Sequence, residues 1–167
     1  PGRRVSDDSG ASAVEFALVV PLLLLLVFGI INFGIIFSQQ LTMNNAVREG
    51  ARRAVVNDQS SSRTCDQILA AVQNDMSGLA LNKTAVKIKI TQNGFTNSNG
   101  CGSAYQSTSF GSGTKDNVPC KGSASGTGIP SLQVEAQYVS SIPIAFPPFP
   151  TTITLNSKAV YRCEFSA

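Results

Sequence analysis

The chain has 167 residues, which leaves room for one modest domain beside a long helix. It carries a net charge of +3 and contains no histidine, so the commonest metal ligand and the commonest general base are both missing. Its lysines and arginines form no stripe interleaved with aromatic side chains, which disfavours nucleic acid as a partner. Because it also lacks a recognisable nucleophile motif and paired carboxylates, the sequence predicts a non-enzymatic protein without a cofactor or metal site.

Residues 1–10, PGRRVSDDSG, are polar and charged, and the apolar segment of the chain comes after them. A secretory signal peptide has the opposite order, because its apolar region precedes the small-residue cleavage site. From the residues alone, this stretch is either a leader that is removed or a cytoplasmic tail that is kept.

A single long helix is predicted over residues 11–57. Its first part, about residues 16–37, reads FALVVPLLLLLVFGIINFGIIF and holds no charged residue, so it is long enough to span a bilayer. Pro21 lies within this span and removes one backbone hydrogen bond, which predicts a kink or a local loosening. Glu15 sits just inside the apolar edge, where an unpaired charge is costly, so we expect a positive charge from another molecule to pair with it.

The stretch GASAVEFALVVPLLLLLVFGIINFGIIFSQQLTMNNAVREGARRAV resembles the TadE-like pseudopilins of tight-adherence (Tad) pili. The resemblance lies in the EFAL start, the proline within the apolar run, the aromatic–glycine spacing and the closing AVREGAR. It covers about residues 10–56, and AVYRCEF near the end of the chain is a weaker echo. A glycine followed by four residues, a glutamate and a phenylalanine also resembles the cleavage and assembly signature of the type IV pilin superfamily.

The resemblance implies that a prepilin peptidase cuts after Gly10 and leaves Ala11 as the new N-terminus. It also implies that Glu15, which Phe16 follows, pairs with the α-amino group of a neighbouring subunit during assembly. The implied partners are the peptidase, other pilin or pseudopilin subunits, a pilus platform membrane protein and the lipid bilayer. The implied function is a minor structural subunit that is assembled into, or initiates, a Tad-type pilus for surface adherence. The alternative is a single-pass membrane receptor or adhesin whose outer domain does not polymerise.

Beyond Phe37 the helix becomes amphipathic. One stripe at helical spacing is apolar and is expected to pack on the downstream domain; it consists of Val47, Ala51, Ala54 and Val55. Glu49 and Arg53 are four residues apart in the favourable order, which predicts a weak ion pair on the helix surface.

Positive charge does not orient the span, because Arg3 and Arg4 before it are nearly balanced by Arg48, Arg52 and Arg53 after it. The four cysteines all follow the span and include no CxxC pair, which disfavours zinc and favours two disulfides in an oxidising compartment. We therefore expect the N-terminus to lie inside and residues 58–167 outside, first at the inner membrane and then in an extracellular pilus.

Four cysteines allow three connectivities. We expect Cys101 to pair with Cys120, which would close the loop between them, and Cys65 to pair with Cys163, which would tie a helix to the last strand.

Residues 58–167 are predicted to form an extracytoplasmic α+β domain with disulfides. After a polar linker, Thr64 or Asp66 is expected to cap a second helix over residues 65–81. The apolar face of this helix would consist of Ile68, Leu69, Val72, Met76 and Leu79.

Strict alternation of apolar and polar residues predicts strands over residues 85–92 and 131–140, and residues 151–165 predict a third strand or a broken strand pair. Residues 93–130 are expected to be a loop rich in glycine, serine and asparagine. The segment IPIAFPPFP, residues 142–150, contains four prolines and cannot be a central strand, so it is either a turn packed on the core or a subunit contact. The fold class is therefore α+β: a helical stalk followed by about three antiparallel strands covered by helices.

Overall fold

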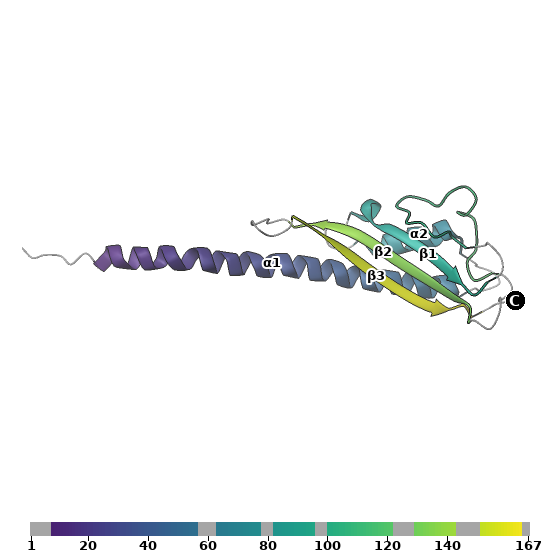
Figure 1. Ribbon diagram of the computed structural model, residues 1–167, viewed down its shortest axis with the longest axis horizontal. Helices are drawn as coiled ribbons and strands as arrows, with labels where there is room; N and C mark the ends of the chain where they lie inside the picture. The colour runs from purple at the N-terminus through teal and green to yellow at the C-terminus, as the bar shows by residue number, and fades with distance from the viewer. Residues whose placement is uncertain are drawn as a thin grey trace, which may run out of the picture.

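The computed structural model describes residues 8–56, 63–77, 82–95, 100–121, 129–142 and 151–164. In these ranges, helix α1 (Asp8–Val55) is followed by helix α2 (Cys65–Asp75), the 3-10 turn η1 (Lys83–Ala85) and the strands β1 (Lys87–Asn93), β2 (Ser131–Ser141) and β3 (Thr152–Arg162). Figure 1 shows α1 as a long rod whose second half lies along a small sheet, with α2 beside it. The predicted α+β class is confirmed.

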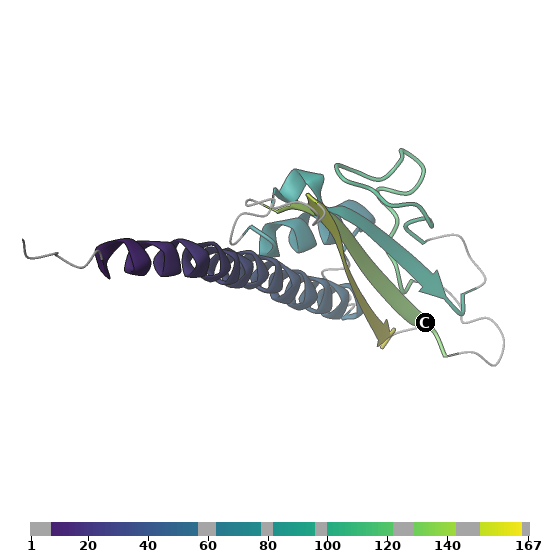
Figure 2. The same ribbon diagram turned by 60° about the vertical axis from the view of Figure 1, so that its left-hand side comes forward.

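Helix α1 is continuous through Pro21 and begins at Asp8, three residues before the predicted start. A proline in a helix leaves one carbonyl without its usual partner, but the long apolar run on both sides continues the helical pattern. In Figures 1 and 2 the first half of α1 extends away from the rest of the molecule, whereas the second half contacts β2, β3 and α2.

The three strands form an antiparallel sheet in the order β1-β2-β3. The central strand β2 pairs Ile90 with Val134 on one side and Val134 with Ala159 on the other, so buried side chains line up across all three strands. This register follows from the alternation in the sequence, because a shift by one residue would turn each apolar set toward solvent. The third predicted strand is a single strand, β3, rather than a broken pair.

One layer of α1 and α2 covers the inner face of the sheet, and the core lies between the layers (Figure 2). The stripe predicted on α1 is confirmed, since all four of its members are buried. The largest fully buried side chains come from α1, α2, β1, β2 and the segments beside them: Met43, Val47, Ile68, Leu69, Val72, Met76, Val86, Ile88, Ile90, Pro119, Leu132 and Val134.

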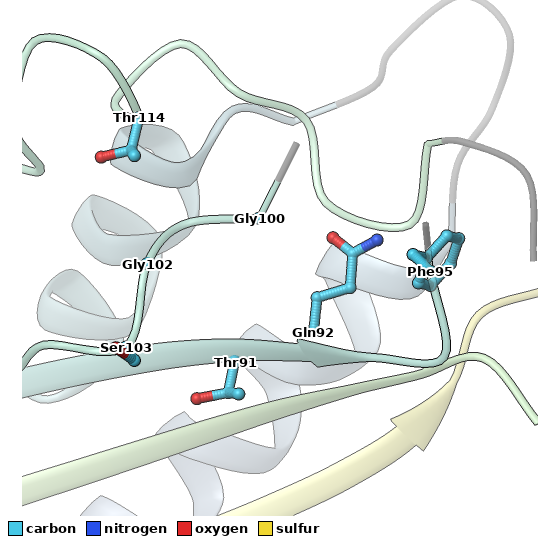
Figure 3. Close-up of a pocket in the computed structure, with 7 residues that line it drawn as sticks. All are labelled: Thr91, Gln92, Phe95, Gly100, Gly102, Ser103 and Thr114. Carbon is cyan, nitrogen blue, oxygen red and sulfur yellow. The ribbon is translucent and has the colours of Figure 1, made fainter. Parts of the chain in front are cut away.

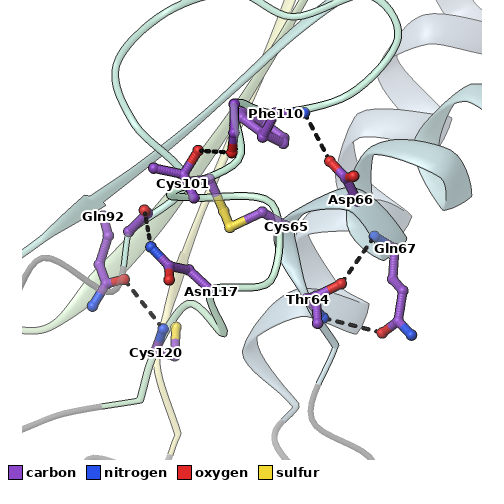
Figure 4. Close-up of a disulfide and its surroundings, with 12 residues drawn as sticks. Thr64, Cys65, Asp66, Gln67, Gln92, Cys101, Phe110, Asn117 and Cys120 are labelled. Carbon is purple, nitrogen blue, oxygen red and sulfur yellow. Dashed lines mark hydrogen bonds between the residues drawn. A yellow bond between two sulfur atoms is a disulfide. The ribbon is translucent and has the colours of Figure 1, made fainter.

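Helix α2 begins as predicted, with Thr64 as its cap. The Thr64 side chain accepts a hydrogen bond from the Gln67 backbone, and the Gln67 side chain accepts one from the Thr64 backbone (Figure 4). This reciprocal arrangement satisfies two backbone donors at the start of the helix. The helix ends at Asp75, and Leu79 of its predicted apolar face lies outside the described residues.

The disulfide pairing expected from the sequence is wrong. The structure pairs Cys65 with Cys101 and Cys120 with Cys163, with Cα atoms 5.4 Å and 5.5 Å apart. The chain after Cys101 runs along α2 and does return to its own start, but there the first residue of α2 lies against Cys101, and Cys120 lies beside the end of β3. The Cys65 backbone donates to the Asn117 carbonyl, and the Asn117 side chain donates to the Gly100 carbonyl (Figure 4).

The segment from 100 to 121 is therefore attached to different elements at its two ends. Cys101 fastens it to the first residue of α2, and Cys120 fastens it to the end of β3. Between these points, Gln106 forms a two-way backbone bridge with Ile88 of β1, and the Phe110 backbone donates to the Asp66 carboxylate. Most of the proline-rich segment 142–150, with the subunit contact or turn expected there, lies outside the described residues.

Candidate functional site

The first half of α1 exposes a continuous apolar surface. Most of its large apolar side chains from Val14 to Phe37 are 37–75% exposed, with Leu18 at the upper limit and Phe28 at the lower. The members are Val14, Phe16, Leu18, Val19, Leu22, Leu23, Leu24, Leu25, Leu26, Val27, Phe28, Ile30, Ile31, Phe33 and Phe37. An apolar surface of this size marks a contact with a membrane or with another protein. Among the described residues, α1 is the helix that is long and apolar enough to cross a bilayer.

The predicted assembly residues lie at the start of this surface. Glu15 and Phe16 are both exposed on α1. They belong to the first half of α1, which extends away from the folded domain (Figure 1). The described ion pairs all belong to the domain and to the second half of α1, and none of them includes Glu15. Within the described part of the chain, Glu15 therefore leaves its charge available to an outside partner.

The predicted cleavage junction, Gly10–Ala11, lies in the first turn of α1 rather than before the helix. A side chain built at Gly10 would meet no atom within 4 Å, so the folded structure places no steric demand on this glycine. Any requirement for glycine at this position must come from a molecule that acts on the chain.

A set of three polar contacts, one of them fully buried, fixes α1 to the sheet where the apolar surface ends. The Ser140 hydroxyl donates to the Gln39 side chain at 2.6 Å, and the Ser157 hydroxyl donates to the Asn44 side chain at 2.7 Å. Gln40 donates to the Asn156 carbonyl on the outer edge of β3 at 2.8 Å. We call these three contacts the polar clasp; because they are directional, they fix both the depth and the rotation of α1 on the sheet.

Helices α1 and α2 are in close contact at Gly50. A methyl group placed on Gly50 would collide with Cγ2 of Val72, so only glycine allows this distance between the two helices. On the outer side of the same turn, Glu49 accepts hydrogen bonds from Arg52 and Arg53, and Arg53 also pairs with Asp75 of α2 at 3.2 Å. The bonds from Arg52 and then Arg53 lower the pKa of Glu49 to about 2.

Residues 10–52 match the family model described as TadE-like protein. This N-terminal segment is TadE-like. No curated protein and no solved structure matches the chain. The resemblance to TadE-like proteins is thereby confirmed, and it associates the chain with Tad pili. TadE-like pilus components are structural rather than enzymatic.

The TadE-like segment contains three physically different parts. It begins at the glycine junction with Glu15 and the exposed apolar surface, continues through the α1 side of the polar clasp, and ends in the turn that contacts α2. The closing AVREGAR thus has a structural explanation: its Ala46, Val47, Gly50 and Ala51 are buried, and its Glu49 and Arg52 pair at 2.9 Å. The predicted pair of Glu49 with Arg53 is also present, at 2.7 Å.

Sequence reasoning missed the polar clasp and the link between Arg53 and Asp75. The signal for the clasp was the run of amides after Phe37, in SQQLTMNN, which is unusual on the buried side of a helix. The partners of these amides come from β2 and β3, more than one hundred residues later in the chain, so no local pattern identifies them.

Proposed function

We propose that this chain is a structural pseudopilin of the type IV pilin superfamily, a subunit that is assembled into or initiates a Tad-type pilus for surface adherence. The observation that carries the proposal is the division of α1 into two halves. From Val14 to Phe37 most of its apolar side chains are exposed, whereas from Gln39 to Val55 it is fixed to the domain by buried contacts. One continuous helix thus joins a segment suited to a membrane or filament core to a folded outer domain.

Transfer of this helix from a bilayer to a filament keeps its apolar surface out of water in both places. Before assembly, lipid surrounds the exposed half of α1; afterwards, the equivalent halves of neighbouring subunits surround it. The domain must move together with α1 when the helix enters the filament, so a rigid attachment between the two is needed. The polar clasp and the close contact at Gly50 supply that attachment.

Glu15 is proposed to set the axial position of each subunit. Cleavage after Gly10 by a prepilin peptidase would create a positive α-amino group on Ala11, four residues before Glu15, or about 6 Å along a helix. A neighbouring subunit displaced by about this distance brings its amino group level with Glu15. Because either charge alone is costly among packed apolar helices, only a pair in register is stable there.

The membrane orientation and the partners follow from the same proposal. The N-terminus lies inside, where the peptidase and a platform membrane protein act, and the domain lies outside, where disulfides form. The domain is large for a principal Tad subunit, which favours a minor subunit that initiates or caps the pilus. A single-pass receptor or adhesin that does not polymerise is the competing function, and it requires neither cleavage nor Glu15.

The assembly role is tested by replacing Glu15 with glutamine and measuring the chain in the sheared surface fraction and in membranes. We expect Glu15→Gln to insert into membranes normally and to disappear from the sheared fraction. Glu49→Gln is the matched control, because Glu49 lies on the same helix but faces Arg52 and Arg53 of its own chain. Equal incorporation of the Glu15 variant and the wild type would contradict the charge-pairing role.

The processing step is tested at Gly10. Gly10→Ala meets open space and cannot disturb the folded chain, so an uncut product would reflect peptidase recognition alone. Gly29→Ala, which also meets open space, is the control and should be cut normally. Normal cutting of the Gly10 variant would contradict the proposal that the peptidase recognises Gly10 at its cleavage site.

A further inference from the structure

The domain begins immediately after the exposed apolar surface of α1. Phe37 is the last member of that surface, and the buried contact between Gln39 and Ser140 comes two residues later, about 3 Å along the helix. In Figure 1 the near end of the sheet lies beside α1 where the free half of the helix begins. The helix therefore has no linker between the segment that is long enough to cross a bilayer and the folded domain.

The length of the apolar run fixes where this end of the domain lies relative to a membrane. The placement rests on the proposed function, in which α1 spans a bilayer before assembly. Residues 16–37 rise by about 33 Å as a helix, which matches a hydrocarbon core about 30 Å thick. The headgroups add about 5–8 Å on each side. With the apolar run in the hydrocarbon core, Gln39 and Ser140 lie in the outer headgroup layer.

The strands β2 and β3 bring further side chains to the same level. Val139 precedes Ser140 in β2, and the partner of Ser140 across the sheet is Ile153 of β3. The Ile142 backbone donates to the Thr151 carbonyl, so the paired part of the two strands continues past this level, toward the free half of α1. The near end of the sheet therefore lies in the headgroup layer together with Gln39.

Four large apolar side chains at this level are exposed, and together we call them the apolar rim: Phe37, Leu41, Val139 and Ile153. The two members on the sheet lie on opposite faces. Val139 alternates with the buried Ser140 and so lies on the outer face, whereas Ile153 is paired with Ser140 and lies on the inner face.

The two members on the helix point away from the sheet. Phe37 and Leu41 are each two residues from Gln39, about 200° around the helix axis, and Gln39 faces the sheet. Exposed apolar side chains thus leave the molecule in several directions at one level. A single protein partner would cover one side, whereas a headgroup layer surrounds a spanning protein at a fixed depth. The rim also continues the apolar surface of α1, which makes lipid the partner that fits it.

The charges near the rim suit the same partner. The described residues at this end of α1, β2 and β3 include no charged side chain; they are 38–47, 138–142 and 151–157. On α1, β1 and β3 the charged residue nearest to the rim is basic: Arg48, Lys87 and Lys158. On β2 it is Glu135, which already pairs with Lys89 and Lys158. Basic side chains near a membrane surface are attracted to anionic headgroups.

We propose that the apolar rim is a lipid-contact surface, which seats the domain in the outer headgroup layer of the membrane before assembly. Because the polar clasp fixes α1 to the sheet, the same contact holds Phe37 at the edge of the hydrocarbon core. It also turns the far end of the domain toward water. The cavity beside the last residues of β1 lies there, and its lining includes hydroxyl and amide side chains, those of Thr91, Gln92, Ser103 and Thr114 (Figure 3).

Tryptophan fluorescence tests the proposal, because the chain contains no tryptophan and a single substitution therefore reports on one position. The protein is the oxidised full chain at one molecule per lipid nanodisc, so no neighbouring subunit is present. Val139→Trp reports on the rim. Val160→Trp is the matched control, since the two valines are 57% and 52% exposed on the same face of the sheet. Val160 lies six residues along β3 from Thr154, the partner of Val139, or about 20 Å farther from the rim.

We expect lipids brominated near the headgroup to quench Val139→Trp and to leave Val160→Trp unquenched. Acrylamide, which stays in water, should quench Val139→Trp roughly half as strongly as Val160→Trp, because a tryptophan at the interface keeps one side in lipid. Ile153→Trp, on the opposite face of the sheet, should behave like Val139→Trp. Leu26→Trp, within the apolar run, should be quenched by lipids brominated deep in their chains. Each variant should melt like the wild type, since the replaced side chains are exposed.

The outcomes separate the rim from the membrane span. If Leu26→Trp is quenched by lipid but acrylamide quenches Val139→Trp as strongly as Val160→Trp, α1 spans the bilayer and the proposed role of the rim is wrong. Protection of Val139→Trp from acrylamide without quenching by brominated lipid would also overturn the proposal, because protein rather than lipid would then cover the rim. An unquenched Leu26→Trp would contradict the membrane span itself, and the lipid contact of the rim with it.

Discussion

The Oγ atom of Ser140 in β2 lies 2.6 Å from Oε1 of Gln39 in α1, and both residues are almost completely buried. This hydrogen bond joins residues 101 positions apart at the point where α1 leaves the sheet. The bond holds α1 at a fixed position relative to the sheet, and its contribution to stability can be tested by substitution.

Ser140→Ala should destabilise the domain by about 1–3 kcal/mol, because the Gln39 oxygen would stay buried without its donor. For a domain of this size, each kcal/mol corresponds to a melting temperature lower by about 4–8 °C. Ser141→Ala, at the exposed neighbouring position, is the control and should melt like the wild type. Identical melting of the two variants would show that the polar clasp does not hold the helix.

Gly50→Ala should also destabilise the domain, by about 1–3 kcal/mol, because the added methyl group collides with Val72. Gly34→Ala introduces the same group into open space on the same helix and should cause no loss. Combining Gly50→Ala with Val72→Ala removes the colliding atoms, so part of the lost stability should return. A Gly50 variant as stable as the Gly34 variant would contradict the close contact of α1 and α2.

Acid should weaken the charged cluster around Glu49. Its pKa in the folded chain is lowered from 4.5 to about 2 by hydrogen bonds from Arg52 and Arg53. The stabilising contribution is therefore present above pH 4.5 and is lost as the pH falls from about 4.5 to about 2. Melting curves across this range should show a smaller acid-dependent loss for Glu49→Gln than for the wild type. The same acid dependence in both proteins would mean that Glu49 is not paired in solution.

The disulfide connectivity can be read directly from peptides. Trypsin cuts between all four cysteines, so each one falls in a separate peptide: residues 64–83, 90–115, 116–121 and 163–167. Without reduction, we expect the first peptide linked to the second and the third linked to the fourth. A link between Cys101 and Cys120 would support the pairing expected from the sequence and contradict the pairing in the structure.

Removing a disulfide should be costly in a domain this small. Cys65→Ala combined with Cys101→Ala releases one end of the segment from 100 to 121, and denaturant unfolding should show a loss of about 2–5 kcal/mol. Unchanged stability of this double variant would contradict a structural role for the bridge.

Local patterns in the sequence predicted the elements of the fold well. Alternation at Ile88 and Ile90, and at Leu132 and Val134, placed β1 and β2 and turned the correct side chains inward. Thr64 was correctly named as a possible cap of α2. Strand alternation and helix capping are set by residues a few positions apart, so a local stretch of sequence is enough to predict them.

The sequence did not predict features that depend on the path of the chain in space. The disulfide pairing was wrong because the contacts of Asn117 bring the first residue of α2 to the start of the loop, where Cys65 meets Cys101. The polar clasp was missed because its two sides come from segments more than one hundred residues apart. The start of α1 at Asp8 was missed because polar residues at a helix start resemble a separate leader.

The most direct test of the central claim is the intact mass of the chain recovered from sheared surface filaments and, separately, from membranes. The account predicts a species in the filament fraction that begins at Ala11, with both disulfides formed. A chain that keeps Gly10 and the residues before it, and that is found in membranes but not in filaments, would contradict the account and favour a single-pass receptor.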